Sequence, residues 1–264
     1  TKNAMKFEKI FIDQSCACQK NKGTHYAFYY LKRYLKKITK NGNGNAYFMH
    51  LDIRSFFMSI DKGVLFSIIK KHIKNPEVAW LVEKIIFHNP TKDYIIKGDL
   101  KLLKSVPPHK SLFGKNNCGL PIGNLTSQFF ANVYLNELDQ FIKHSLKCRH
   151  YFRYMDDIIL IHPSEKQLLV WRDNIKTFLE TDLKLKLHPK KQIIRPAKCG
   201  INFCGYIVKP DYTLVRRRTV KRLKNKLWHF NKKIMETLAA DDLPLACNII
   251  FNNRFTVSSD PRFF

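Results

Sequence analysis

Three aspartates stand in surroundings that suit metal-dependent chemistry. Asp52 follows an apolar segment, residues 46–51, that predicts a buried strand, and Asp156 and Asp157 are adjacent between two short apolar segments. Carboxylates at the ends of apolar strands are costly to desolvate unless a cation or a donor meets them. Magnesium binds a few carboxylates together with water and substrate phosphates, and paired ions promote phosphoryl transfer. These acids therefore point to metal-assisted nucleotidyl transfer.

Each acid also has a simpler structural interpretation. Asp156-Asp157 would suit a polar hairpin turn, where aspartate is common. Asp52 would suit the N-cap of a helical segment beginning at Ile53. The acids alone leave both interpretations open.

Charge and composition narrow the class of protein. The 264 residues include 47 lysines and arginines against 21 acids, a net charge of +26 that favours a polyanionic partner such as nucleic acid. A hydrophobic content of 45% excludes a disordered chain. No apolar run reaches the ~18 residues of a membrane span, and the polar start predicts a cytoplasmic protein. Seven cysteines without a C-x-x-C pair favour reduced, structural thiols.

The elements that must position the acids form a mixed α+β pattern. Helices are expected at 26–38, 64–73, 77–87, 125–142, 166–181 and 219–239, and strands at 46–51, 150–153, 158–161 and 201–208. Residues 97–109 are expected to form a loop, and no periodicity is found after Asp242. The two short strands around residues 154–157 predict a hairpin with the paired acids at its tip.

The three aspartates belong to a longer series of sequence motifs. Residues 154–157 (YMDD), between short apolar strands, resemble the catalytic turn of reverse transcriptases, and residues 51–57 (LDIRSFF) are similar to their first catalytic motif. Residues 119–128 (GLPIGNLTSQ), continuing to 131–135 (ANVYL), are similar to the motif between the two acid sites. Residues 187–191 (LHPKK), 203–206 (FCGY) and 18–25 (CQKNKGTH) match further motifs in the family's order. Together the motifs are far more specific than any one of them.

The resemblance implies a right-hand polymerase of the α+β class that makes DNA on an RNA template. It implies fingers at 1–45, palm at 46–62, a fingers/palm insertion at 63–118, palm with the catalytic hairpin and primer grip at 119–210, and a short, partial helical thumb at 211–264. The expected partners are template RNA, a primer with its growing cDNA, and deoxynucleoside triphosphates.

The resemblance also assigns roles to residues. Asp52, Asp156 and Asp157 would bind two Mg²⁺ ions, with Mn²⁺ as a substitute, and Lys191 would donate a proton near the leaving pyrophosphate. Phe57 would exclude a ribose 2′-hydroxyl. The remaining substrate contacts would come from Lys20, Lys22, Ile122, Gly123, Gln128, Tyr154 and Met155, and the primer grip from Phe203, Cys204, Gly205 and Tyr206. Solvated lysines and ordinary core aromatics are the competing interpretations of these side chains.

One subfamily resemblance is narrower. Many reverse transcriptases carry Gln-Gly and Ser-Pro where this chain has Ile122-Gly123 and Ser127-Gln128, a form similar to the enzymes of bacterial or phage diversity-generating retroelements. That similarity implies error-prone copying of template adenines and a basic helical accessory protein. An apolar Ile122 beside the nascent pair would discriminate less than a hydrogen-bonding glutamine. A defence-associated bacterial reverse transcriptase and a nucleic-acid-binding scaffold with a decayed site are the alternatives.

A basic segment near the end of the chain completes the expected site. We expect its cations to track a phosphate backbone from one helix, against the simpler interpretation of a solvated helix face. These cations are Arg216, Arg217, Arg218, Lys221, Arg222 and Lys224.

Overall fold

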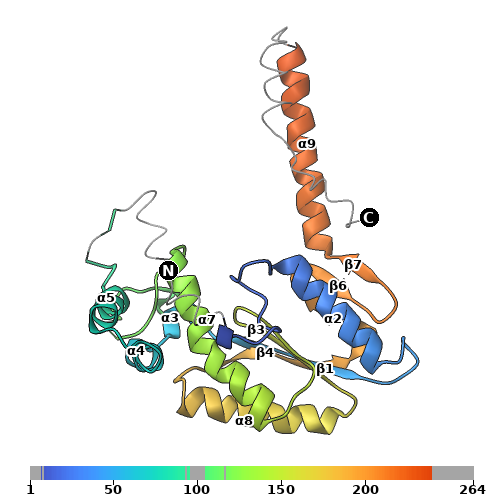
Figure 1. The fold of residues 1–264 in the computed structure, drawn as a ribbon. Helices are drawn as coiled ribbons and strands as arrows, with labels where there is room; N and C mark the ends of the chain where they lie inside the picture. Colours follow the sequence, from blue (N-terminus) through green and yellow to red (C-terminus); the bar gives the residue numbers. More distant parts are fainter. Residues whose placement is uncertain (1–6, 8, 93, 96–104, 116, 240–264) are drawn as a thin grey trace. The chain divides into compact units, whose positions relative to one another are not determined.

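The computed structural model describes residues 7, 9–92, 94–95, 105–115 and 117–239 (Figure 1). The chain divides into two compact units, Thr1–Leu214 and Val215–Phe264. Most of the loop expected at 97–109, Cys247 and the region after Asp242 lie outside the described residues.

A four-stranded antiparallel sheet organises the first unit. Its order is β2 (Tyr151–Tyr154), β3 (Asp157–His162), β1 (Tyr47–Ile53) and β4 (Leu187–Pro196). The strands expected at 46–51, 150–153 and 158–161 are confirmed, each with ends shifted by a residue or two. Strand β4 was not expected, because its charged side chains and two prolines, Pro189 and Pro196, hide the strand pattern.

The sheet is buried on both faces, so alternate residues of its central strands feed two cores. Met49, Leu51, Ile158 and Leu160 belong to one core, which also contains residues of α7 (Leu125–Gln140) and α8 (Glu165–Thr181). The opposite core contains Phe48, Phe152, Ile159 and Ile161 with residues of α2 (Thr24–Ile38). Figure 1 shows α7 and α8 on one side of the sheet and α2 on the other.

Three helices follow β1 along the chain: α3 (Phe56–Ser59), α4 (Lys62–Lys70) and α5 (Pro76–Phe87). The Asp61 carboxylate caps α4 by accepting a 2.9 Å bond from the Val64 amide, and the Asn75 side chain caps α5. A π-helix, η2 (Phe141–Ser145), continues α7, and the 3₁₀ turns are η1 (Pro108–Lys110) and η3 (Ala197–Cys199). The expected helices are confirmed, although α4 ends three residues before Ile73.

The strand expected at 201–208 is a hairpin. Strands β5 (Ile201–Phe203) and β6 (Tyr206–Val208) join through Cys204 and Gly205, and β7 (Thr213–Val215) completes a small three-stranded sheet. The turn residues have φ angles of 48° and 92°, and two positive values favour a tight hairpin.

The second unit contains one described helix, α9 (Arg217–Ala239), which confirms the helix expected at 219–239. In the part of the chain that the structure describes, no helix is long and apolar enough to cross a bilayer. The six described cysteines are free thiols, as the cysteine pattern predicts.

Candidate active site

Two of the three aspartates lie opposite each other on neighbouring strands. Asp52 of β1 is in register with Asp157 of β3. The pairing of β1 with β4 shifts between Leu51 and Ile53, a bulge at Asp52 of the kind that redirects a side chain. Asp52 is only 8% exposed and sits within the strand, so its interpretation as a helix N-cap is wrong; Ser55 occupies the N-cap of α3.

The third aspartate lies in the hairpin turn beside them. Tyr154 pairs with Asp157, which leaves Met155 and Asp156 as a two-residue turn. Met155 has a φ of 54°, a left-handed conformation that costs a non-glycine residue about 1–2 kcal/mol. The hairpin predicted from sequence is therefore confirmed, and it brings all three acids to one end of the sheet.

The acids interact electrostatically. Burial, reinforced by the charges of Asp52 and Asp157, raises the pKa of Asp156 to about 6. Lys191 of β4 donates to the Asp52 carboxylate at 2.9 Å, and this hydrogen bond is the main reason that the pKa of Lys191 is raised. The ring nitrogen Nε2 of His50 lies 3.0 Å from the Asp157 carboxylate.

This arrangement suits a divalent cation by donor type and by charge. Carboxylate oxygens are the ligands that Mg²⁺ prefers, and a cation would offset the repulsion among the acids, which adds to the effect of burial on the pKa of Asp156. Among the described residues, no group of three His, Cys, Asp or Glu side chains has metal-binding geometry as it stands. The fit therefore rests on the three acids' chemistry, and the two-ion site stays a prediction.

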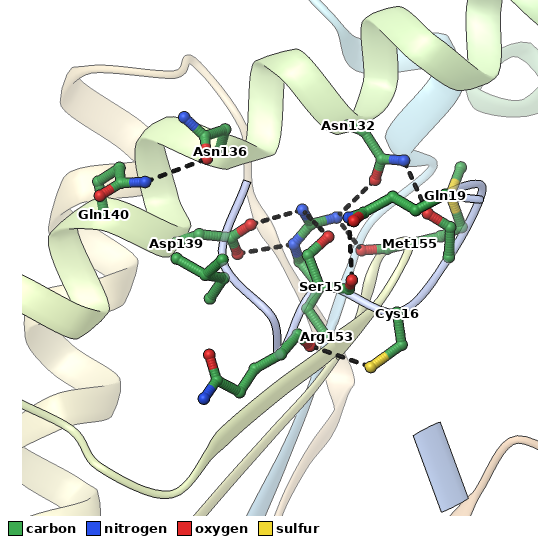
Figure 2. A network of polar contacts seen from close by, with 12 residues as sticks. Ser15, Cys16, Gln19, Asn132, Asn136, Asp139, Gln140, Arg153 and Met155 are labelled. Atoms are coloured by element: carbon green, nitrogen blue, oxygen red, sulfur yellow. Dashed lines mark hydrogen bonds and ion pairs between the residues drawn. The ribbon is translucent and has the colours of Figure 1, made fainter. Parts of the chain in front are cut away.

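A buried arginine lies directly beneath the turn (Figure 2). The guanidinium of Arg153 donates to both carboxylate oxygens of Asp139, at 2.7 and 2.6 Å, and to Asn132 and Ser15 at 3.2 and 2.9 Å. It also donates to the Met155 carbonyl at 3.1 Å. Both members of the Arg153–Asp139 pair are completely buried, and Asp139 raises the pKa of Arg153 against the opposing effect of burial.

This network was not predicted from the sequence. The signal was present: one arginine in an otherwise aromatic strand, facing a helix with Asn132, Asn136 and Asp139 at helical spacing. Buried charges are retained in proteins when they are paired, so this pattern could have been recognised.

The N-terminal segment is tied to the same arginine through the backbone. The Cys16 amide donates to the Arg153 carbonyl at 2.9 Å, and the Arg153 amide donates to the Gln14 carbonyl at 3.0 Å. This pairing brings Cys18 to the active-site turn, where its thiol contacts the Gln128 side-chain oxygen at 3.4 Å and the Met155 sulfur at 3.8 Å. The predicted substrate residues Gln128 and Met155 are thus brought together.

Phe57, the residue predicted to exclude a ribose 2′-hydroxyl, is hydrogen-bonded through its backbone to the motif at residues 119–128. Phe57 is half-buried, next to the fully packed Phe56, and its carbonyl accepts from the Leu120 amide at 2.8 Å. Two residues further on, Ile122 is 71% exposed, and Gly123 has a φ of 103°. Phe57 and Ile122 are therefore linked through a short stretch of backbone.

The two N-terminal lysines differ. Lys20 is exposed. The Lys22 ammonium donates to the carbonyls of Asp13, Ser15 and Ile12 at 3.1, 3.4 and 3.5 Å. These bonds fix the backbone of residues 12–15. Their contact with a nucleotide or template stays a prediction.

The predicted primer grip is the β5–β6 hairpin. Phe203 is buried in the core, as its structural interpretation anticipated, and the Tyr206 ring stacks on Phe28 with centroids 4.6 Å apart. Tyr154, Cys204 and Tyr206 pack against the same core, so the two hairpins lie near each other. The predicted duplex-binding cations belong to the separate second unit. Arg216 was expected on the helix but precedes α9 and is half-buried, whereas the α9 side chains between Arg217 and His229 are exposed.

Comparison with known proteins decides the family. Residues 1–208 match the model of the reverse transcriptase (RNA-dependent DNA polymerase) family. The chain belongs to this family. It is 23% identical over 278 aligned positions to the group II intron-encoded protein LtrA of Lactococcus lactis subsp. cremoris, covering 82% of this chain and 42% of that protein.

Solved structures of telomerases share the reverse transcriptase fold seen here. Apo telomerase from Candida tropicalis, truncated from its C-terminal domain, aligns with a TM-score of 0.57 at 11% identity, over 81% of this chain and 44% of that one. Telomerase from Candida albicans, in complex with a fragment of telomeric RNA, gives 0.52 at 11% identity over 82% and 37%. The α+β fold expected from sequence is confirmed. The chain spans less than half the length of these relatives.

Proposed function

We propose that this chain is an RNA-directed DNA polymerase whose reaction centre is Asp52, Asp156 and Asp157. The observation that carries the proposal is the meeting of β1 and the β2–β3 turn, which gathers three acids beside Lys191 in a member of this family. A group of three carboxylates needs a positive partner, and a nucleotide brings metal-bound phosphates.

Each of these residues would have a different role in nucleotidyl transfer. The three carboxylates would hold Mg²⁺, which when bound activates the primer hydroxyl and neutralises the triphosphate. Lys191 orients the Asp52 carboxylate and supplies a proton toward the leaving pyrophosphate. Phe57 excludes a ribose 2′-hydroxyl, while Phe203 to Tyr206 support the primer end.

Primer extension tests this proposal. On a defined RNA template with Mg²⁺ and deoxynucleotides, Asp156→Ala should lower the rate of extension at least ~1,000-fold. The substitution removes a carboxylate that would hold the Mg²⁺ needed to stabilise the charge of the transition state. Asp173→Ala, which removes an exposed acid on α8, is the matched control and should extend normally. Equal extension by wild type and Asp156→Ala would overturn the proposal.

We further propose the domain roles inferred from sequence: fingers at 1–45, palm at 46–62 and 119–210, a fingers/palm insertion at 63–118, and a partial thumb at 211–264. In this arrangement the exposed cations of α9 contact the phosphates of the template–primer duplex. Arg217→Ala and Arg218→Ala together should reduce the salt dependence of duplex binding without changing which template is preferred.

A narrower proposal concerns fidelity. Ile122 is exposed at the end of the segment joined to Phe57, and it offers the base pair only apolar contact. We propose that it contributes to error-prone copying of adenines, as in diversity-generating retroelements, with a basic helical accessory protein as partner.

Product sequencing tests the fidelity proposal. Ile122→Gln should lower misincorporation opposite adenine several-fold. Leu125→Gln, at a similarly exposed apolar side chain, should leave it unchanged. Misincorporation spread evenly over the four template bases in the wild type would reject the proposal, and synthesis without an added template would favour the defence-associated alternative.

A further inference from the structure

A histidine lies on the same face of the central strand as the first aspartate. His50 interrupts the apolar residues that precede Asp52 in β1. In the register with β3, His50 lies opposite Ile159 and Asp52 lies opposite Asp157, so both side chains of β1 point to one face of the sheet. The His50 side chain is 21% exposed. It is therefore part of the surroundings of the acids, although the proposed reaction assigns it no role.

The packing around His50 does not require a polar ring. Its direct neighbours in the sheet are Ile159 of β3 and Ile193 of β4. Ile159 is completely buried, whereas Ile193 lies at the exposed margin of the sheet. Side chains directly opposite each other on one face of a sheet pack together, and an aliphatic side chain would suit these two neighbours. The imidazole therefore points to a role beyond the core.

The ring of His50 reaches diagonally across the two strands to Asp157. Its Nε2 atom lies 3.0 Å from Oδ1 of the Asp157 carboxylate. An ionised carboxylate only accepts hydrogen bonds, so Nε2 carries the hydrogen and donates it. Within the described part of the chain, this is the one hydrogen bond to the Asp157 side chain, and it leaves Oδ2 for another partner.

The two acids of the sheet are thus each fixed by a donor from the adjacent strand. Lys191 of β4 donates to Oδ2 of Asp52 at 2.9 Å, and His50 of β1 donates to Asp157. The terminal torsion of an aspartate side chain is broad, so a donor on one oxygen restricts the plane of the carboxylate. Carboxylates that bind metal ions in proteins are commonly oriented by outer hydrogen bonds of this kind.

We propose that His50 is a positioning residue for metal binding. By donating to Oδ1 of Asp157, it holds this carboxylate in an orientation that lets it bind a divalent cation together with Asp52 and Asp156. His50 acts through Asp157 and does not contact the reacting atoms. The inference rests on the proposed reaction centre, but it concerns metal affinity and can be measured without catalysis.

Titration of the full chain with Mn²⁺, in the absence of nucleotide and nucleic acid, measures this affinity through the electron paramagnetic resonance signal of the free ion. His50→Leu removes the donor and should weaken Mn²⁺ binding about 10-fold or more, as is typical when an outer hydrogen bond to a ligand is lost. His50→Gln keeps an amide that can donate to Asp157, so it should restore binding to within roughly threefold of wild type. His162→Leu removes a histidine at the other end of β3 and should bind Mn²⁺ like wild type.

Thermal unfolding in EDTA separates lost metal affinity from lost folding. His50→Leu should melt at the wild-type temperature or above it, because its neighbours in the sheet are apolar. If it melts lower, His50→Met, which also lacks a donor, takes its place with the same expected loss of Mn²⁺ affinity. Mn²⁺ binding that is unchanged in the donor-free variant, equally weak in His50→Gln, or weakened in His162→Leu would overturn the proposal, as would a wild type that binds no Mn²⁺.

Primer extension by the wild type keeps this inference apart from the proposed function. A wild type that binds Mn²⁺ but does not extend a primer would contradict the polymerase proposal, while the comparison of the His50 variants would still decide the role of the histidine. A wild type that extends a primer, together with a His50→Leu variant that binds Mn²⁺ normally, would reject only the role of His50.

Discussion

Two hairpin turns of this chain look alike and are held in different ways. The β5–β6 turn consists of Cys204 and Gly205, both at positive φ, with open space around the glycine. The β2–β3 turn also has two residues, but Met155 occupies its left-handed position and no glycine is present. The first turn is encoded by its own residues, whereas the second depends on Arg153, which donates to the Met155 carbonyl.

The difference follows from what each turn must carry. The β2–β3 turn presents Asp156 and Asp157, which repel each other and are partly desolvated. Its residues therefore serve the site as well as the turn, and they do not stabilise the turn by themselves. Backbone strain at functional sites persists when surrounding structure determines it. The buried ion pair and the N-terminal segment provide that support here.

The largest effect on stability is expected from removing Arg153, which supports the β2–β3 turn. Arg153→Ala should destabilise the protein by about 3–5 kcal/mol, because it leaves the buried Asp139 carboxylate without its cation, with the Tyr151 hydroxyl still donating to it. Denaturant unfolding measures the loss. Arg172→Ala, which breaks an exposed pair with Asp173, should cost no more than about 1 kcal/mol. Similar losses in the two variants would contradict the role given to Arg153.

A paired substitution separates support of the turn from general stability. Replacing both partners, Arg153→Met with Asp139→Leu, should recover much of the lost stability, since apolar replacements of buried ion pairs are often neutral. Extension should stay low, because the Met155 carbonyl has lost its donor. Full recovery of both properties would show that the arginine acts only through folding.

The acids themselves should oppose folding when no metal is present. Asp156→Asn removes one charge from a group of three, so in EDTA it should stabilise the protein by about 1 kcal/mol. Adding Mg²⁺ should raise the melting temperature of wild type more than that of the variant. Thermal unfolding with and without Mg²⁺ measures both effects, and an Asp156→Asn protein that is less stable in EDTA would refute the expectation.

The β5–β6 turn should respond to its glycine alone. Gly205→Ala should cost about 1 kcal/mol, because a side chain at this positive φ is strained even with open space around it. Gly205→Asn should cost less, since asparagine tolerates this conformation. Equal melting temperatures for the two variants would show that the turn is not held by its own residues.

The same contrast explains what sequence could predict. The acids, the position of the β2–β3 hairpin and most helices follow from local patterns: apolar alternation, adjacent charges and helical spacing. The β5–β6 hairpin was expected as a single strand at 201–208. The bulge at Asp52 and the Arg153–Asp139 pair depend on contacts between residues far apart in the chain, and strand β4 is a poor strand by its own composition. The cavity lined by Arg54, Lys115 and Lys186 was also missed, because these cations come from three separate segments of the sequence and meet only in the fold.

The smallest effect is expected at the outer support of the β2–β3 turn. Desolvation raises the pKa of the Cys18 thiol, so it keeps its proton at neutral pH and can donate weakly to Gln128 while contacting Met155. Cys18→Ala should change the free energy of unfolding by no more than about 0.5 kcal/mol, since the residue is exposed. It releases the Gln128 side chain, however, so we expect Cys18→Ala and Gln128→Ala to alter the misincorporation spectrum in the same way. Cys199→Ala, at another exposed thiol, is the control and should leave the spectrum unchanged. Different spectra for Cys18→Ala and Gln128→Ala would mean that Cys18 influences the turn through Met155 instead.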